Sequence, residues 1–186
     1  MRNATEQSRL AVAALALACW ACGSDDSSDT EQPCTADTGP GEPANNAEAS
    51  PVTLPPMTDS DPAMYPQIAG VIFGGSDVDW YTYTGSDVAL AIVDPYVAFP
   101  PDLRVCSYFE CVAGTTSVTC PNGTTSDRSG AGKSGCCPSP GYLSYTAIDV
   151  YCGSVDTDEN MRVFIRVDGP GLSASACVPY TVDYHY

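Results

Sequence analysis

The cysteines are the residues best suited to chemistry in this chain of 186 residues. There are 10 of them, most in the second half of the sequence. Cysteines in such numbers form disulfides in an oxidising compartment or bind zinc. Zinc sites use pairs of cysteines about two to four residues apart, whereas Cys136 and Cys137 are adjacent. The sequence favours disulfides over zinc but leaves the pairing open. The disulfide candidates are Cys34, Cys106, Cys111, Cys120, Cys136, Cys137, Cys152 and Cys177.

Aspartates near predicted turns form two candidate calcium sites, because calcium prefers carboxylate oxygens. One is Asp77 with Asp79, and the other is Asp156 with Asp158. The second resembles the first half of an EF-hand, but methionine and valine replace the glycine and glutamate that complete such a loop. The alternative, which we favour, is that these aspartates bend and cap turns.

The sequence offers little for catalysis. His185 is the only histidine, and it is next to last in the chain, where a third group is poorly placed to orient it as a triad requires. Gly130-Ala-Gly-Lys133-Ser134 lacks the earlier glycine of a phosphate-binding loop, since Asp127 stands there. A hydrolase that uses an Asp/Glu pair needs no histidine. We predict that the protein is not an enzyme and keep that hydrolase as the alternative.

Short β-strands must position these residues. In Asp77–Thr84, Val78 and Trp80 fall on one side of a period-two pattern, and Tyr81 and Tyr83 fall on the other. Similar runs are separated by Gly, Pro, Asp and Ser, and no window has a convincing helical period. The fold class predicted is all-β, an antiparallel sandwich or jelly roll of about seven or eight strands. The predicted strands are Ile68–Phe73, Val78–Thr84, Val88–Val93, Leu103–Cys111, Ser117–Cys120, Tyr142–Cys152, Met161–Val167 and Val178–Tyr186.

Two arginines, Arg162 and Arg166, lie on one face of the Met161–Val167 strand. They indicate an anion site or, as we favour, solvated charges on an acidic surface. The Gly/Ser-rich stretch Pro121–Tyr142 is predicted to be a long loop pinned by disulfides. The formal net charge of -16 excludes nucleic acid as a partner, because phosphate binding relies on Lys and Arg.

The first 21 residues are predicted to be a signal peptide. Two arginines precede a run of leucine and alanine that is too short to span a bilayer. The run ends at Ala18-Cys19-Trp20-Ala21-Cys22-Gly23, which resembles the cleavage site of bacterial lipoproteins. That resemblance implies an acylated N-terminal cysteine and a membrane anchor. An even count of remaining cysteines favours Cys22, whereas spacing from the leucines favours Cys19.

The composition changes after the signal. Residues 22–61 are rich in Asp, Glu and Pro and contain no Lys or Arg, so we predict a flexible, extended tether. Cys34 is expected to tie part of it back to the domain. Residues 62–186 are the predicted folded domain.

Three segments of this domain resemble the bacterial pre-peptidase C-terminal family. They are Gly75-Ser-Asp-Val-Asp-Trp-Tyr-Thr-Tyr-Thr84, Arg162-Val-Phe-Ile-Arg-Val167 and Val178-Pro-Tyr-Thr-Val-Asp-Tyr184. The resemblance implies a small β-sandwich in an exported setting and carries no catalytic residues. The cysteine-rich insert from Cys106 to Cys152 is foreign to the family pattern.

We therefore expect a lipid-anchored β-sandwich on the bacterial envelope that binds a protein or a carbohydrate. Its alternatives are the hydrolase above and a purely structural envelope component. Oligomeric state and ligand stay open. No cofactor other than the candidate calcium is expected. Aromatic residues that could form a sugar platform are Tyr96, Phe99, Tyr108, Phe109 and Tyr142.

Overall fold

A computed structural model of the chain describes residues 45–59, 66–87, 96–98, 103–138, 148–153 and 159–186. These residues belong to one compact unit. They form twelve strands and no helix, and most strand pairs among them are antiparallel. The all-β prediction is confirmed.

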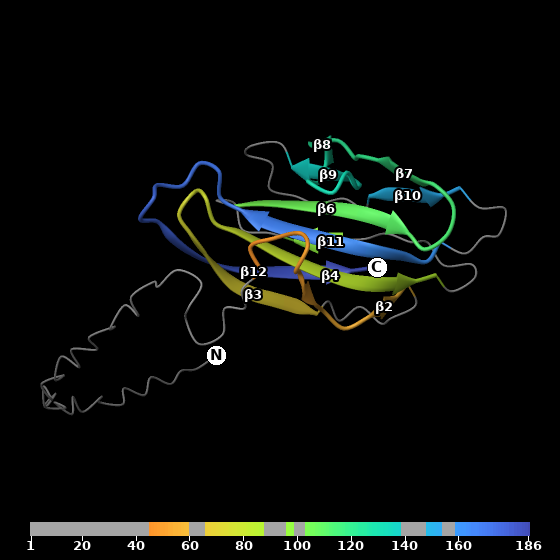
Figure 1. The fold of residues 1–186 in the computed structure, drawn as a ribbon, viewed down its shortest axis with the longest axis horizontal. Coiled ribbons are helices and arrows are strands. Elements are labelled where there is room, and N and C mark those ends of the chain that lie inside the picture. The colour runs from red at the N-terminus through yellow and green to blue at the C-terminus, as the bar shows by residue number, and fades with distance from the viewer. Residues whose placement is uncertain (1–44, 60–65, 88–95, 99–102, 139–147, 154–158) are drawn as a thin grey trace, which may run out of the picture. The chain divides into compact units, whose positions relative to one another are not determined.

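The largest sheet has the strand order β1-β4-β11-β6-β9-β8, with β2 also paired to β4 (Figure 1). At its centre β11 pairs in antiparallel register with both β4 and β6. The alternating pattern places Trp80 on the outer face and Tyr81 on the inner one, as predicted. The strands are β1 (Val52–Thr53), β2 (Met57–Thr58), β4 (Val78–Ser86), β6 (Arg104–Cys111), β8 (Thr124–Arg128), β9 (Ser134–Pro138) and β11 (Met161–Asp168).

A second sheet has the order β3-β12-β5 and lies against the inner face of the first. It consists of β3 (Gln67–Phe73), β12 (Cys177–His185) and β5 (Tyr96–Ala98). In Figure 1, β3 and β12 run below β4, β11 and β6. The two sheets therefore make a sandwich. A separate pair, β7 (Thr116–Thr119) and β10 (Asp149–Cys152), lies near the β8–β9 hairpin.

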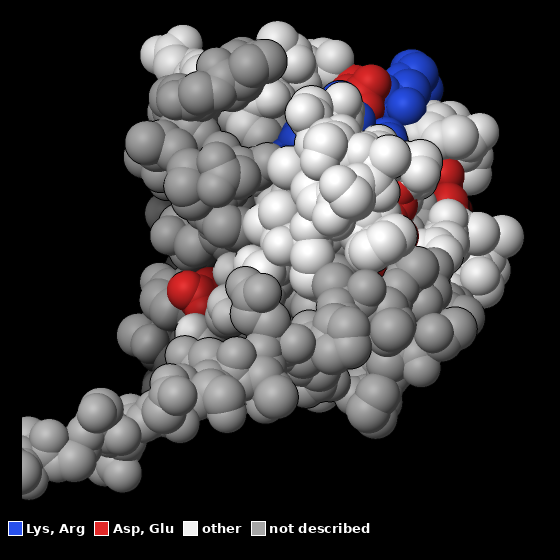
Figure 2. Space-filling view, turned by 90° about the vertical axis from the view of Figure 1, so that its left-hand side faces the viewer, with Lys and Arg blue, Asp and Glu red and all other residues white. Residues whose placement is uncertain are grey.

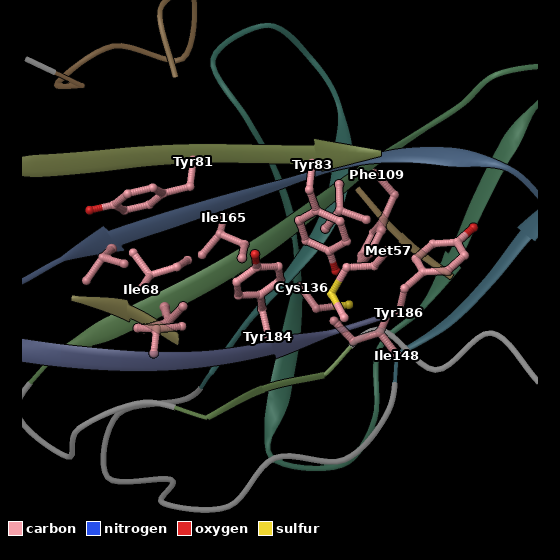
Figure 3. Packing of buried hydrophobic residues seen from close by; sticks show 14 of the residues in the cluster. Met57, Ile68, Tyr81, Tyr83, Phe109, Cys136, Ile148, Ile165, Tyr184 and Tyr186 are labelled. Carbon is pink, nitrogen blue, oxygen red and sulfur yellow. The ribbon is translucent and has the colours of Figure 1, made fainter. Parts of the chain in front are cut away.

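The core lies between the two sheets and is rich in tyrosine (Figure 3). Tyr83 and Tyr184 come from opposite sheets, and their ring centroids are 5.1 Å apart. Gly85 allows Tyr186 to pack against β4, because a Cβ at this glycine would overlap the tyrosine ring. The inward residues of β11, Met161, Val163, Ile165 and Val167, are all fully buried in this core.

One carboxylate, Asp79, lies in this core and is fully buried. The Tyr180 hydroxyl donates a hydrogen bond of 2.6 Å to it. Because that proton is used, Tyr81 is the donor in the 2.6 Å contact between its hydroxyl and that of Tyr180. The pKa of Tyr180 is raised chiefly by burial and further by the neighbouring Tyr81 and Asp79. The hydroxyl of Tyr180 therefore keeps its proton and remains a donor. The buried charge is thereby hydrogen-bonded, as a buried charge must be.

The structure differs from the predicted tether over residues 45–59. Val52–Thr53 and Met57–Thr58 pair in parallel with β4, and Met57 is buried in the core. The prolines of this stretch predicted an extended chain. An extended chain can pair with the exposed backbone groups at the edge of a sheet, and this stretch does so. Its few apolar side chains suffice to pack it onto the sheet.

The structure also places strands where the sequence predicted a loop. Thr124–Arg128 and Ser134–Pro138 form the β8–β9 hairpin within Pro121–Tyr142. Their sequences lack the apolar alternation typical of strands. The predicted strand Val88–Val93 and the first six residues of Tyr142–Cys152 lie outside the described residues.

Candidate functional site

Three disulfides join described cysteines, in agreement with the prediction. They are Cys106–Cys137, Cys111–Cys152 and Cys120–Cys136. The adjacent Cys136 and Cys137 thus attach β9 to two different segments, one before β8 and one in β6. The disulfides indicate an oxidising, extracytoplasmic location.

Cys177 is also disulfide-bonded. The other six described cysteines pair among themselves. The partner of Cys177 therefore lies outside the described residues. Of the cysteines there, Cys34 is the predicted disulfide candidate, and Cys19 and Cys22 are the lipidation candidates.

The disulfides and short ladders fix an insert made of β7, β8, β9 and β10 at one side of the sandwich (Figure 1). Gly135 of β9 lets this insert approach β6 closely, because a Cβ there would overlap the carbonyl oxygen of Ser107. The backbone pairing between β9 and β6 extends over only three residues of each strand. Cross-links therefore compensate for strands too short and polar to hold this part of the chain by themselves.

An open hollow of about 480 Å³ lies between three of these strands. Its wall is formed by main-chain and side-chain atoms of β7, β8 and β9, and most of the surface is polar. The lining residues are Thr116, Ser117 and Val118 of β7, Ser126, Asp127 and Arg128 of β8, and Ser134 and Gly135 of β9. The sequence analysis missed this site, because hydroxyl-rich strands carry no recognisable motif.

The Asp127 side chain lies on the face of β8 opposite to those of its neighbours Ser126 and Arg128, and it contacts the buried part of the protein. Its Oδ2 atom accepts a 2.7 Å hydrogen bond from the hydroxyl of Tyr108. Tyr108 is fully buried and stacks on Trp80 with 5.6 Å between ring centroids. Burial, followed by Asp127, raises the pKa of Tyr108, so the hydroxyl keeps its proton and stays a donor. The carboxylate is thus held by a rigid aromatic pair.

Basic side chains lie on or beside the outer face of the large sheet. Arg104 makes a two-point contact with Asp168, at 2.8 and 2.6 Å. Arg166 reaches the same carboxylate at 2.5 Å and lies over the ring of Trp80. Figure 2 shows blue side chains gathered near the top beside red ones. Arg166 is thus paired within the fold, whereas Arg162 is exposed and lies near the Phe164 ring.

Most of the segment dismissed above as a phosphate-binding loop, Gly130–Lys133, lies in the turn between β8 and β9, and this turn holds a carboxylate. Glu48 accepts hydrogen bonds from the Ser129 hydroxyl at 2.6 Å, the Ala131 amide at 2.8 Å and the Lys133 ammonium at 3.1 Å. Lys133 also lies 4.3 Å from the centre of the Phe164 ring. The turn therefore fastens residue 48 to the insert.

The candidate calcium ligands serve other contacts in the structure. Asp77 accepts hydrogen bonds from the amides of Phe73 at 2.6 Å and Val78 at 2.9 Å, as a turn-capping aspartate does. Asp79 faces the core, as described above. Asp156 and Asp158 lie outside the described residues. Calcium at these four positions stays a prediction.

Among the described residues, one grouping of three metal-type ligand atoms occurs, formed by Cys106, Asp127 and Cys137. The two sulfurs are bonded to each other. A disulfide sulfur has no thiolate to offer to a metal. The grouping therefore does not fit a metal ion.

Carboxylates also gather where β4 ends and β11 begins. Burial, and then a hydrogen bond with Asp59, raises the pKa of Asp87 above its ordinary value, despite a hydrogen bond from the Glu159 amide. Burial and the neighbouring Asp87 raise the pKa of Glu159 as well. Burial, together with mutual repulsion, thus favours the protonated forms of Asp87 and Glu159.

Two of the five aromatic residues of the candidate sugar platform are not exposed. Tyr108 and Phe109 are both buried, with 0% and 1% of their surface exposed, because both faces of β6 are covered. The side chains of Tyr96, Phe99 and Tyr142 are not among those described. His185 ends β12, and its carbonyl oxygen accepts a 2.6 Å hydrogen bond from the hydroxyl of Tyr83.

Comparison with known proteins finds no matching family model, curated protein or solved structure. The class defined by the fold and the disulfides is an extracytoplasmic all-β domain. Within the described ranges, no helix is long and apolar enough to cross a membrane.

Proposed function

We propose that the protein is exported, anchored to the cell envelope through a lipidated Cys22 or Cys19, and acts as a non-catalytic binding module for a protein or a carbohydrate. The pre-peptidase C-terminal resemblance supports an exported sandwich domain. The disulfides support an oxidising compartment. The lipid anchor rests on the sequence around the two N-terminal cysteines.

One observation supports binding above all: the insert carries an open polar hollow outside the sandwich core. Around it, the hydroxyls of Ser117 and Ser134 make no hydrogen bond within the described part of the chain, whereas the core carboxylate Asp79 is engaged. Groups that have hydrogen-bonding capacity on a rigid support suit ligand recognition.

The test uses the oxidised mature chain, on glycan arrays and in pull-downs from envelope extracts. We expect saturable binding to one ligand class, and no turnover of that ligand. Absence of binding to either class would contradict the proposal and favour a structural component. Mass spectrometry of the mature N-terminal peptide tests the anchor separately, because an unacylated peptide excludes it.

The carboxylates at the end of β4 favour one second candidate, the hydrolase with an Asp/Glu pair. Raised pKa values of Asp87 and Glu159 are a feature of many catalytic acids. Turnover of a bound glycan that is abolished by Asp87→Asn, with binding retained, would establish this candidate in place of the non-catalytic module.

A further inference from the structure

We propose that a second hollow, on the outer face of the large sheet, binds a free α-amino acid with an apolar side chain. Arg162 pairs with the carboxylate of this ligand and Glu110 pairs with its ammonium group. The inference goes beyond the proposed function, because it concerns another part of the molecule and another class of ligand.

Three polar side chains of this hollow stand in one row across three neighbouring strands. Arg162 of β11 lies directly opposite Thr84 of β4 on one side and Glu110 of β6 on the other. Residues directly opposite each other in paired strands point to the same face of a sheet. That face is the outer one, since Phe164, two residues along β11, packs with Trp80 there.

The row borders an open hollow of about 290 Å³, whose lining also includes Cys111 and Val112. The amide of Val112 donates a 2.9 Å hydrogen bond to the carbonyl of Asn160, which fixes the chain at the end of β6. The Cys111–Cys152 disulfide fastens the same end. The backbone that carries these side chains is therefore ordered before any ligand arrives, which lowers the entropic cost of binding.

The polar groups of the row are available to a ligand. The side chains of Arg162, Glu110 and Thr84 make no hydrogen bond or ion pair to any described residue. By contrast, Arg104 on the same face is paired with Asp168. The guanidinium of Arg162 thus keeps its five N–H donors, and the carboxylate of Glu110 keeps its acceptor sites.

The two charges restrict the class of ligand. An anion would pair with Arg162 but would meet Glu110 and the formal charge of -16 of the chain. A cation would pair with Glu110 but would meet Arg162. A zwitterion satisfies both groups, because a guanidinium holds a carboxylate by two parallel hydrogen bonds and a carboxylate accepts hydrogen bonds from an ammonium group.

Spacing and size indicate an α-amino acid among the zwitterions. The Cβ atoms of directly opposite residues are about 4.5–5.5 Å apart, so the two charged side chains reach groups that are attached to one carbon atom. The hollow of about 290 Å³ is at the lower limit of the range of about 300–1,000 Å³ for small-molecule sites. It therefore suits a single residue better than an oligomer. Val112, which is 71% exposed, offers an apolar surface to the side chain of the ligand.

The test titrates the oxidised full-length mature chain with leucine and follows binding by ligand-observed NMR. Two probes each lack one charge of leucine: N-acetylleucine has no ammonium group, and leucinamide has no carboxylate. We expect leucine to bind roughly tenfold or more tightly than either probe, because each probe loses the hydrogen bonds to one charged side chain.

Two variants assign the charges. Glu110→Gln should bind leucine and N-acetylleucine about equally, and Arg162→Gln should bind leucine and leucinamide about equally. Both should bind leucine roughly tenfold more weakly than the wild type. Their melting temperatures should change little, since both side chains are exposed. Asp149→Asn is the control, at an exposed carboxylate that lines neither hollow, and should bind leucine as the wild type does.

Three results would overturn the inference: leucine does not bind, a singly charged probe binds at least as tightly as leucine, or Glu110→Gln and Arg162→Gln bind leucine as well as Asp149→Asn does. Each of these results leaves the proposed binding of a protein or a carbohydrate intact. That function rests on the hollow between β7, β8 and β9 and is tested with other ligands.

Discussion

Single side chains in this protein carry large structural consequences where they hold a buried or half-buried charge. Glu48 is the clearest case at the surface. Burial alone would raise its pKa, but the hydrogen bonds from Ser129, Ala131 and Lys133 together lower it below the ordinary 4.5. The ionised form is therefore the one that fastens residue 48 to the β8–β9 turn.

We predict that Glu48→Gln lowers the free energy of unfolding by about 1–2 kcal/mol near neutral pH, since it weakens charge-assisted hydrogen bonds. A lowered pKa gives stability that is present above the ordinary value and lost as pH falls through the value in the folded state. The difference in stability between the wild type and the variant should therefore shrink as pH falls below the ordinary pKa of 4.5 and disappear only below the lowered pKa that Glu48 has in the folded protein. Denaturant unfolding at several pH values measures this.

The control is Glu110→Gln, at an exposed carboxylate of β6, which should leave stability nearly unchanged. A difference between wild type and Glu48→Gln that persists at low pH would show that the carboxylate charge is not the cause.

In the core, Tyr180 holds a buried charge, because its hydroxyl donates a hydrogen bond to Asp79. Tyr180→Phe removes the donor to Asp79 and the acceptor for Tyr81, and it leaves a buried charge less well hydrogen-bonded. We predict a loss of about 1–3 kcal/mol in the free energy of unfolding. Tyr184→Phe, at a tyrosine whose ring is equally buried, is the comparison. Equal losses in both variants would contradict the role of the Asp79 contact.

Elements rich in apolar alternation could be predicted from the sequence, and the others could not. β4, β6 and β11 have inward residues every second position, and their predicted bounds differ from the observed ones by at most two residues. β8 and β9 contain mainly Ser, Thr, Gly and Cys, so nothing local distinguishes them from a loop. β9 is held extended by two disulfides and by pairing with β6, and β8 is held by pairing with β9.

The same limit applies to the candidate site. In the sequence, Asp127 was noted only because it stands where a phosphate-binding loop would need a glycine. Its contact with Tyr108 joins β8 to β6, and the hollow on the other face of β8 needs β7 as well. Such a site arises from tertiary packing. The cysteines were the one local signal that pointed to this part of the chain.

Close approach of β9 to β6 depends on a residue without a side chain. We predict that Gly135→Ala lowers the free energy of unfolding by about 1–3 kcal/mol, the typical cost of overpacking, because the new Cβ would overlap the Ser107 carbonyl oxygen and the Tyr108 ring. Thermal unfolding of the oxidised protein measures it.

Gly132→Ala is not a neutral comparison, since Gly132 has a φ of 85°, which favours glycine. Gly171→Ala is the matched control, because a Cβ there would meet nothing within 4 Å. Equal stability of Gly135→Ala and Gly171→Ala would contradict the close packing of β9 on β6.

At the scale of the whole molecule, a disulfide between the N-terminal region and the sandwich would determine how closely an envelope anchor holds the domain. Cys177 begins β12 and is disulfide-bonded to a cysteine outside the described residues. If Cys22 is acylated and Cys19 is removed with the signal, Cys34 is the partner left.

We therefore predict a Cys34–Cys177 disulfide in the mature protein. Peptide mapping without reduction should yield the two cysteine peptides joined, and Cys34→Ser should leave one free thiol that a maleimide labels at Cys177. Cys34→Ser should also lower stability, because a cross-link over so long a stretch restricts the unfolded chain. A Cys177 peptide joined instead to Cys22 would contradict both the pairing and acylation at Cys22, because one sulfur cannot carry both bonds.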